Sequence, residues 1–373
     1  MQYLPNFLFA ILLIAGIGFF VKNIKKIFRN IKLGKDIDRS DNKSERWKNM
    51  AYIALGQSKM VKRPVSGFLH VIVYVGFVII NIEVLEIIID GLFGTHRVFK
   101  GLIGDSFYGL LIGIFEVLAG LVFIAVTIFW IRRNIIKVKR FLNKEMKGWP
   151  KNDGNYILYF EMVLMGLFLL MNSADTPFQD AGVGNVISQF IVPLFDGLSV
   201  NSLHLIERTA WWIHITGILV FLNYLYYSKH LHILLAFPNT FYANLDAMGK
   251  FTNDKNVTKE VQLMMDPSAD PFAAPPEGAE DEVPEKFGAS DVTDLNWVQL
   301  LNAYTCTECG RCTSVCPANQ TGKELSPRSI MMKTRDRLEE VGKNIDVNGE
   351  FKDDNKQLLN DYISPEELWA CTS

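Results

Sequence analysis

Five long apolar runs stand out in the first part of the chain, separated by stretches that are rich in charge. They cover residues 1–21, 65–89, 106–131, 156–171 and 210–228. A helix needs roughly 20 apolar residues to cross the hydrocarbon core of a bilayer. The pattern therefore predicts five transmembrane helices. A further apolar run, 183–195, is too short to span, and we expect an interfacial or re-entrant piece of a loop there.

Lysine and arginine are distributed unevenly between the loops. Six of them follow the first run between residues 22 and 35, and five follow the third between residues 132 and 140, whereas residues 172–209 hold only Arg208. The positive-inside rule then places the N-terminus outside and the C-terminal part in the cytoplasm. Because the basic residues follow the first run instead of preceding it, the pattern favours a membrane anchor over a cleaved signal peptide.

Beyond residue 238 the long apolar runs end. Residues 241–263 are amphipathic, and residues 264–294 carry Asp-Pro and Pro-Pro pairs and the acidic run Glu280-Asp281-Glu282, which predicts an extended linker. We expect a helix over 297–304, capped by Asp294 or Asn296.

A second C-terminal helix is expected over 328–341, because Ser326 and Pro327 form a cap followed by proline at the first helical position. Further helices are expected near 356–362 and after Ser364. The fold class predicted from these patterns is all-α. It consists of a five-helix transmembrane bundle in 1–238, an amphipathic segment and linker in 239–296, and a small helical domain in 297–373.

Composition agrees with this division and excludes some functions. The chain is 49% hydrophobic and 21% charged, and its net charge of −2 gives no signature of nucleic-acid binding. All five cysteines lie after residue 305, so no secreted disulfide framework is visible, and a reducing cytoplasmic location follows for this part.

Four of the cysteines form one tight motif, Cys306-x2-Cys309-x2-Cys312-x3-Cys316-Pro317. This spacing is typical of iron–sulfur ligation, in which three thiolates hold one [4Fe–4S] cluster and the cysteine before proline reaches a second. Such short loops strain disulfide geometry. The alternative is a zinc site, which usually shows two separated pairs of cysteines.

Histidines in or near the apolar runs are candidate haem ligands, because ionisable groups are costly in a bilayer. His214 and His232 lie 18 residues apart, so on one continuous helix they would share a face about 27 Å apart in height. His70 begins the second span and would lie at the depth of His232. Two histidines at one depth on different helices suit a b-type haem. The alternative is that each is a lone hydrogen-bonding group, or that His232 is a solvated helix end.

Acidic residues also occur in the second span. Glu83, Glu86 and Asp90 fall within about 60° of one another on a helical wheel. Their functional interpretation is proton exchange at a quinone site, for which we retain Glu83 and Glu86. The alternative is that they face the outer loop or pair with Arg97, Arg208 or Lys100, which we favour for Asp90.

The histidine pattern carries a resemblance to known proteins. The run Gly67-Phe-Leu-His70-Val-Ile-Val-Tyr-Val-Gly76, with His214 and His232 before Pro238, resembles the haem-b subunit of respiratory nitrate reductase and the membrane subunit of heterodisulfide reductase. The resemblance implies an inner haem b on His70 and His232. In the nitrate-reductase pattern the second helix gives two histidines, but residues 78–81 here read Val-Ile-Ile-Asn. An outer haem on His214 therefore lacks its expected partner, and the implied haem count is one or two.

Residues 297–337 closely resemble membrane-anchored, heterodisulfide-reductase-like iron–sulfur oxidoreductases. The likeness lies in Leu300-Leu301, the cysteine motif, Thr321-Gly322-Lys323 and Leu325-Ser326-Pro327. These proteins fuse a five-span haem-b domain to an α-helical ferredoxin, and some are implicated as electron-transferring-flavoprotein:menaquinone oxidoreductases. The resemblance implies two [4Fe–4S] clusters, menaquinone or another quinone as substrate, and a bacterial or archaeal cytoplasmic membrane as the location.

The fifth cysteine, Cys371, resembles the opening of a second cysteine motif that the chain, which stops at residue 373, does not finish. The family pattern then assigns Cys316 and Cys371 to the second cluster and leaves the first to be completed from the missing motif. A catalytic domain with Cys-Cys-Gly motifs would lie beyond residue 373 or on another subunit. The alternative is a free terminal thiol.

The expected function is a quinone-linked oxidoreductase that passes electrons between a cytoplasmic donor, reduced electron-transferring flavoprotein, and the quinone pool of the membrane. Two alternatives stay open. One is a thiol–disulfide oxidoreductase resembling heterodisulfide reductase, and the other is an electron-wiring subunit with no substrate site of its own. No catalytic side chain is assigned within the chain itself.

Overall fold

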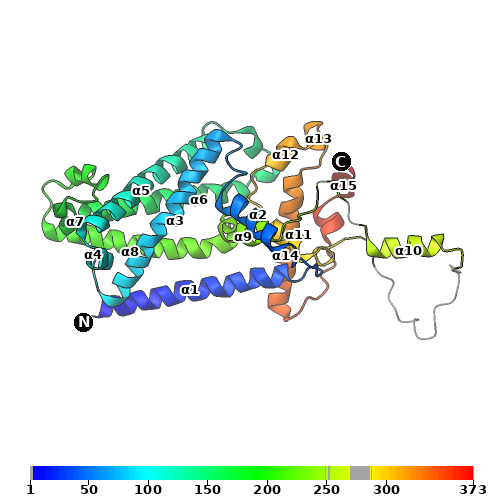
Figure 1. Ribbon diagram of the computed structural model, residues 1–373, viewed down its shortest axis with the longest axis horizontal. Helices are drawn as coiled ribbons and strands as arrows, with labels where there is room; N and C mark the ends of the chain where they lie inside the picture. The colour runs from blue at the N-terminus through cyan, green and yellow to red at the C-terminus, as the bar shows by residue number, and fades with distance from the viewer. Residues whose placement is uncertain (1–2, 248, 251–252, 269–285, 287, 373) are drawn as a thin grey trace.

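The computed structural model describes residues 3–247, 249–250, 253–268, 286 and 288–372. Within these residues every regular element is helical, and β pairing is confined to two isolated bridges, Lys35–Asn296 and Leu359–Ile363. The predicted all-α class is confirmed. Figure 1 shows a bundle of long helices that runs into a smaller helical group formed by residues 297–369.

Five helices are long and apolar enough to cross a membrane, as predicted. They are α1 (Leu4–Ile31), α3 (Pro64–Phe93), α5 (Asp105–Asn134), α6 (Trp149–Ala174) and α8 (Val200–Tyr224). Each packs chiefly against two of the others, in the order α1, α3, α5, α6, α8 and back to α1. The five spans therefore form a closed ring, and their facing side chains fill its interior.

Helix α1 is longer than the apolar run 1–21 from which it was predicted. It continues through the basic residues because Ile24, Ile27 and Ile31 recur at helical spacing and pack into one core. The lysines between them lie on the outward side. The last two turns of α1 thus leave the predicted span and reach the C-terminal helices.

The expected continuous helix from His214 to His232 is wrong. Helix α8 ends at Tyr224 and is followed by two 3-10 turns, η6 (Leu225–Tyr227) and η7 (Lys229–Leu231), before a separate helix α9 (His232–Phe241). Ser228 has extended backbone angles (φ −112°, ψ 147°), and its hydroxyl donates to Asp153 at 2.6 Å. The chain turns at this serine, so His214 and His232 do not share a helical face.

Short elements cover both ends of the bundle. At the end opposite the C-terminal helices, here called the distal end, lie α4 (Val98–Ile103), α7 (Thr176–Ala181) and the 3-10 turns η4 (Ser188–Phe190) and η5 (Val192–Phe195). The apolar run 183–195 thus forms only short turns. At the other end lie α2 (Lys43–Met50), the π-turn η1 (Ala51–Leu55), η2 (Lys139–Phe141) and η3 (Lys144–Met146).

The C-terminal unit, as we name residues 288–372, is built mainly from helices. It contains η8 (Val292–Asp294), α11 (Trp297–Thr305), α12 (Arg311–Val315), α13 (Pro317–Gln320), α14 (Pro327–Asn348), the turn η9 (Leu358–Tyr362) and α15 (Pro365–Trp369). Three helix caps are the residues that the sequence predicts. Asn296 caps α11 in a capping box, Ser326 caps α14, and Ser364 caps α15.

In the amphipathic stretch 241–263, α9 ends at Phe241 and α10 (Lys255–Met265) begins the next helical segment. One expectation for this region needs correction. The helix expected near 356–362 is an irregular turn, in which Asn360 adopts a left-handed conformation (φ 78°). The predicted linker lies largely outside the described residues, and the predicted domain boundaries remain predictions.

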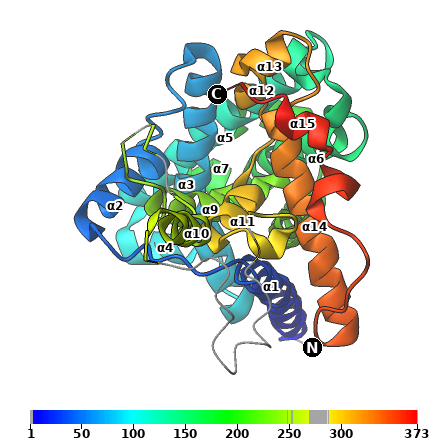
Figure 2. The same ribbon diagram turned by 90° about the vertical axis from the view of Figure 1, so that its right-hand side faces the viewer.

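One apolar core joins the bundle to the C-terminal unit. Its buried members include Ile27 and Ile31 of α1, Phe221 at the end of α8, Leu300 and Leu301 of α11, and Leu338 and Val341 of α14. A polar contact, Asn30 Nδ2 to the Tyr304 hydroxyl at 2.9 Å, lies within it. Burial of each such leucine or isoleucine stabilises the docked arrangement by about 1.5–3 kcal/mol. Figure 2 shows the C-terminal unit packed across the end of the bundle.

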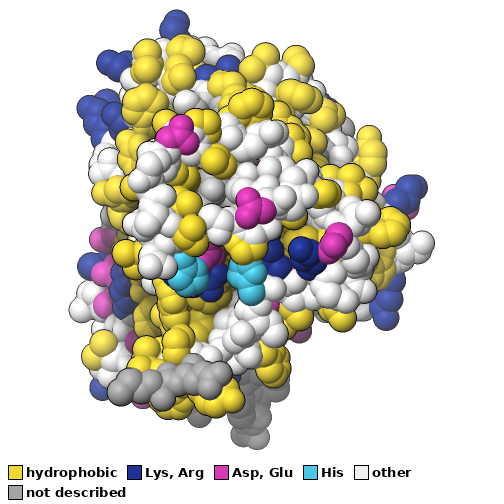
Figure 3. Space-filling view, turned by 90° about the vertical axis from the view of Figure 1, so that its left-hand side faces the viewer, with side chains coloured by type: hydrophobic (Ala, Val, Ile, Leu, Met, Phe, Trp, Pro, Cys, Tyr) yellow, Lys and Arg dark blue, Asp and Glu magenta, His cyan; other side chains and the backbone are white. Residues whose placement is uncertain are grey.

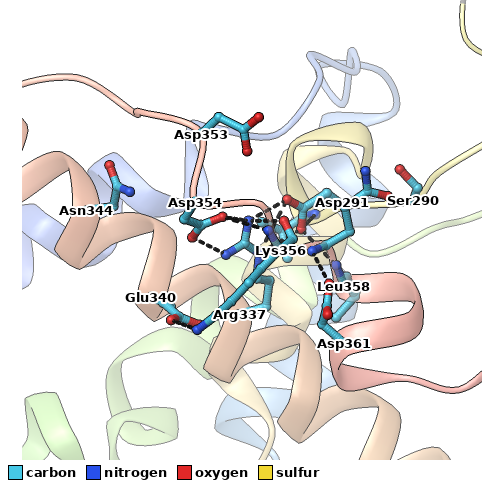
Figure 4. Close-up of polar contacts among 12 residues, drawn as sticks. Ser290, Asp291, Arg337, Glu340, Asn344, Asp353, Asp354, Lys356, Leu358 and Asp361 are labelled. Atoms are coloured by element: carbon cyan, nitrogen blue, oxygen red, sulfur yellow. Dashed lines mark hydrogen bonds and ion pairs between the residues drawn. The ribbon is translucent and has the colours of Figure 1, made fainter.

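Arg337 of α14 organises the other side of the C-terminal unit. Its side chain is fully buried, and its guanidinium contacts Asp291 at 2.8 Å, Asp354 at 2.6 Å and the Lys356 carbonyl at 2.7 Å (Figure 4). Three segments that are distant in sequence therefore meet on one side chain. These hydrogen bonds help to fix the return of the chain toward η8.

We predict that Arg337→Met destabilises the protein by about 3 kcal/mol, because removal of one partner leaves two partly buried carboxylates without their counter-charge. Thermal unfolding of the detergent-solubilised protein measures this loss. Lys323→Met removes an exposed cation of the same unit and serves as the control. Equal unfolding temperatures for the two variants would contradict the prediction.

A pH dependence follows from Asp294. Burial opposes its ionisation, but Lys286 Nζ at 2.5 Å and the amides of Asp291 and Ser290 hold the pKa of Asp294 at about 2. A carboxyl whose pKa is depressed in the folded state stabilises the fold above its ordinary pKa of about 3.9 and loses that contribution as pH falls toward the folded value. We expect the wild-type protein to lose stability between pH 4 and pH 2, and Asp294→Asn to flatten this part of a stability profile.

Candidate cofactor site

His70 and His232 face each other where the bundle meets the C-terminal unit. Their ring centres lie 6.5 Å apart with an angle of 37° between the ring planes. Two imidazoles that ligate one metal ion from opposite sides, at metal–nitrogen distances of about 2.0–2.1 Å, have ring centres about 6.3 Å apart. The separation therefore fits a bis-histidine iron, although His232 reaches it from α9 and not from the fifth span.

The environment of the two rings also fits ligation. His232 Nδ1 lies 3.0 Å from the Lys229 carbonyl oxygen, which orients the ring and leaves Nε2 free. Metal-bound histidines commonly donate their second N–H to a carbonyl in this way. Burial lowers the pKa of His232 and favours the neutral form that binds metals. His70 Nδ1 is buried and has no hydrogen-bond partner in the described part of the chain.

The cysteine motif begins where α11 ends. Cys306 is the first residue after the helix, and the loop that follows turns through two left-handed residues, Glu308 (φ 53°) and Gly310 (φ 71°), before α12. Besides its positive φ, a second feature favours glycine at position 310, since a Cβ there would lie 2.3 Å from Arg328 Nη1. Cys316 then directly precedes α13, with Pro317 at its first position. The motif thus folds as a compact loop between short helices.

The Cys306 thiol lies beside a backbone amide and a cation. Burial raises the pKa of the Cys306 thiol, while the Glu308 amide and the charge of Arg335 oppose that rise. Hydrogen bonds and charges of this kind tune iron–sulfur clusters. Among the described residues no three His, Cys, Asp or Glu side chains converge closely enough to hold a single metal ion. The four thiolates of a [4Fe–4S] cluster bind different iron atoms and lie further apart than the thiolates around one zinc ion. The finding therefore counts against the zinc alternative more than against an iron–sulfur cluster.

Cys371 lies just after α15, and its side chain is exposed. Both ribbon views place this end of the chain beside α12 and α13 (Figures 1 and 2). The cysteine motif and the cysteine predicted to open a second motif are thus on the same side of the C-terminal unit. Their assignment to two clusters remains a prediction.

Glu308 ties the cysteine loop to the segment that carries His232. Its carboxylate is 3% exposed and accepts a hydrogen bond from Arg335 of α14 at 2.6 Å and another from Lys229 Nζ. Burial would raise the pKa of Glu308, but these two cations hold it below its ordinary value. Lys229 is also the residue whose carbonyl orients His232. One buried carboxylate therefore connects the loop, α14 and the histidine segment.

Arg311 connects the same loop to the other histidine. Its Nη2 lies 3.5 Å from the sulfur of Met60, and its guanidinium is within electrostatic range of His70. Met60 in turn packs against Gly67, where an added Cβ would lie 2.5 Å from the Met60 carbonyl oxygen. The cysteine motif thus contacts segments next to both histidines. Neither Glu308 nor the contact of Arg311 with Met60 was identified from sequence, because no local pattern encodes their distant partners.

The remaining histidines are placed differently. His214 is buried in α8 beside Phe168, with ring centres 6.2 Å apart, and its Nδ1 has no hydrogen-bond partner among the described residues. His96 and His204 are exposed at the distal end, where they pair with Asp175 and Glu207. The structure thus brings His70 and His232 together but places no second histidine ring in contact with His214 in the described residues.

His230 was not singled out from sequence, yet it packs against His232 with ring centres 5.4 Å apart. Its Nε2 lies 3.6 Å from a carboxylate oxygen of Glu161 in α6. The predicted acidic pair lies far from this region. Glu83 and Glu86 are both buried near the distal end, and Asp90 accepts the amide of Arg97 at 2.7 Å, in keeping with the alternative favoured for it.

We predict that Glu308→Gln lowers the amount of iron and acid-labile sulfide bound per chain to less than half. The substitution removes the carboxylate that Lys229 and Arg335 share and leaves each of them a more distant one, Asp153 at 3.8 Å and Asp336 at 3.9 Å. We expect a cost of about 3–5 kcal/mol, concentrated in the cysteine loop. Glu324→Gln, an exposed change just beyond the motif, is the matched control. The double variant Glu308→Gln with Lys229→Met should recover part of the loss, and unchanged iron content in the single variant would refute the role of the ion pair.

Comparison with known proteins was made over the whole chain. No protein-family model matches it, and no solved structure matches it. The chain is 28% identical over 397 aligned residues to the "Probable iron-sulfur-binding oxidoreductase FadF" of Bacillus subtilis, covering 98% of this chain and 52% of that protein. It is 23% identical over 369 residues to the "EtfAB:quinone oxidoreductase" of Syntrophomonas wolfei, covering 91% and 46%.

A shorter match joins 14% of the chain to 8% of the "Probable membrane-anchored ferredoxin" of Chromohalobacter salexigens, at 37% identity over 51 residues. The chain spans about half the length of the first two relatives. These names agree with the redox character of the cysteine motif and with the five apolar helices. The chain is therefore a membrane protein similar to iron–sulfur oxidoreductases, among them an EtfAB:quinone oxidoreductase.

Proposed function

We propose that the protein is a membrane-bound oxidoreductase that passes electrons between a soluble electron-transferring flavoprotein and a membrane quinone. The observation that carries the proposal is the closeness of the two candidate sites, since the cysteine loop contacts segments beside both His70 and His232. A flavin releases electrons to one-electron carriers, and bound [4Fe–4S] clusters and haem b supply that chemistry. The name of the Syntrophomonas wolfei relative supports the flavoprotein and the quinone as partners.

Each group of residues has a defined task in this proposal. Cys306, Cys309 and Cys312 provide thiolates for one cluster, and Cys316 and Cys371 provide thiolates toward a second. His70 and His232 would hold haem b through their ring nitrogens. Glu308, Lys229 and Arg335 hold the loop against the histidine segment, which keeps the separation between the sites constant. A fixed separation matters because electron transfer weakens steeply with distance.

The proposed orientation places the C-terminal unit in the cytoplasm. Basic residues are concentrated at the end of the bundle that bears this unit. Lys26 and Arg29 of α1 pair with Asp346, and the Arg140 carbonyl accepts from Arg328. The positive-inside rule assigns such an end to the cytoplasm. A soluble flavoprotein would then meet the C-terminal unit from the cytoplasmic side.

The test of the haem assignment is a dithionite-reduced minus oxidised spectrum of the intact protein. We expect a b-type signal in the wild type, and its loss in both His70→Ala and His232→Ala. His204→Ala, which changes an exposed histidine at the distal end, should retain it. A wild type without a b-type signal would end the haem proposal, and a signal that persists in His70→Ala would exclude that ligand.

The test of the reaction is the oxidation of reduced electron-transferring flavoprotein by the intact protein in the presence of a quinone analogue. Wild-type protein should sustain turnover, and Cys309→Ser should abolish it while leaving the detergent-solubilised protein folded. If reduced flavoprotein stays reduced with wild-type protein and quinone together, the flavoprotein proposal is wrong.

A further inference from the structure

A small cavity lies at the distal end, between α3, the loop that follows it, and α8. Its volume is about 20 Å³, and its wall includes Glu83 of α3, Asp175 at the end of α6, and Trp211 of α8. Its wall also includes Thr95 and His96, which are exposed. Figure 3 shows histidine side chains next to acidic and basic ones at this end of the molecule. A cavity needs about 10–15 Å³ to hold one water molecule, so this one has room for a water.

The carboxylates around the cavity form a dense network, and all but one have hydrogen-bond donors. Glu86 accepts from the Phe99 amide and the Tyr108 hydroxyl, both at 2.8 Å, and Asp90 accepts from the amides of Arg97 and Val98. Asp175 accepts from Arg97 Nε at 2.8 Å, and Glu207 pairs with Arg208. Arg97 also donates to Tyr108 and Asn172. These contacts give the network a structural role.

Glu83 is the exception in the cavity wall. Its side chain is 3% exposed, and its Oε2 is buried with no hydrogen-bond partner among the described residues. An unpaired carboxylate inside a membrane protein is costly, so the group is stable only if it holds a proton or bonds a water. Glu86, one turn further along α3, spends both of its oxygens on protein donors. The structure therefore provides a carboxyl that can exchange a proton without breaking a protein hydrogen bond.

We propose that Glu83 is a proton-transfer site that carries protons from the aqueous phase at the distal end to a quinone. His96 and a water in the cavity connect Glu83 to the surface. His96 Nε2 lies 3.2 Å from Asp175 at the mouth of the cavity. Bond by bond, the Glu83 carboxylic acid gives its proton to an oxygen of the reduced quinone and becomes a carboxylate. A proton from the cavity water then restores the acid, and His96 or bulk water replaces that proton.

This inference rests on the proposed function, because the two electrons that reduce the quinone come from the flavoprotein donor. Reduction takes two electrons and two protons, so Glu83 gives up and regains a proton twice in each cycle if it supplies both protons. With the C-terminal unit in the cytoplasm, electrons and protons reach the quinone from opposite faces of the membrane. Turnover in that case moves charge across the bilayer.

The test uses the intact protein in vesicles, which is reduced with dithionite and then freed of excess reductant, and it follows the reoxidation of the bound cofactors by a water-soluble quinone analogue. Glu83→Gln keeps the size of the side chain but removes the exchangeable proton, so quinone reduction should slow by about 10²-fold. Reduction of the bound cofactors by dithionite should be unchanged. Infrared difference spectra should show a carboxylic-acid carbonyl band in the wild type that is lost in Glu83→Gln.

Glu116→Gln is the matched control, because Glu116 is also fully buried but lies outside the cavity wall and is hydrogen-bonded to Asn172 and to the amides of Ile187 and Ser188. Its variant should keep the infrared band. Wild-type rates or an intact band in Glu83→Gln would overturn the assignment of Glu83. A wild type that oxidises no reduced flavoprotein, but whose pre-reduced cofactors still reduce the quinone analogue, would overturn the flavoprotein proposal and leave that of Glu83 standing.

Discussion

A single apolar core that runs from α1 and the end of α8 into α11 and α14 is the contact on which the rest of the structure depends. Apolar packing is strong but has little direction, so it joins the two parts without setting the register between them. The buried ion pairs supply the direction. Glu308 between Lys229 and Arg335, and Arg328 on Glu145, each fix one point of the C-terminal unit on the bundle. Together the apolar core and the ion pairs hold the transmembrane bundle and the C-terminal unit in one arrangement.

Much of the fold could be predicted from the sequence, because the relevant signals are local. Each span is visible in the sequence as a long run of mostly apolar residues, close to the length that a bilayer requires. Likewise, Ser326 with Pro327, and Ser364 with Glu367, specify helix starts within a few positions. The break after α8 could not be predicted. Ser228 turns the chain because Asp153, 75 residues away, binds its hydroxyl and the following amide.

The candidate site also combines features that can be predicted from the sequence with features that cannot. The cysteine spacing and the depths of His70 and His232 are visible in the sequence, but Glu308 and Arg311 gain their roles from partners 79 and 251 residues away. His214 shows the opposite case. Its position on a spanning helix suggested ligation, yet its ring packs against Phe168 and meets no second histidine in the described residues. The position of a residue along a spanning helix gives its depth in the membrane, but it does not show which side chain of a neighbouring helix faces it.

The closed ring of spans has a consequence for biosynthesis. Helix α1 leaves the ribosome before the other four spans, yet its neighbours include α8 and the C-terminal helices, which emerge some 200 to 300 residues later. Phe9 packs on Trp211, and Asn30 bonds Tyr304. Until α8 is inserted, the face of α1 that packs on α8 is covered by lipid or by an insertion factor. The ring closes only when α8, the last of the five spans, joins the bundle.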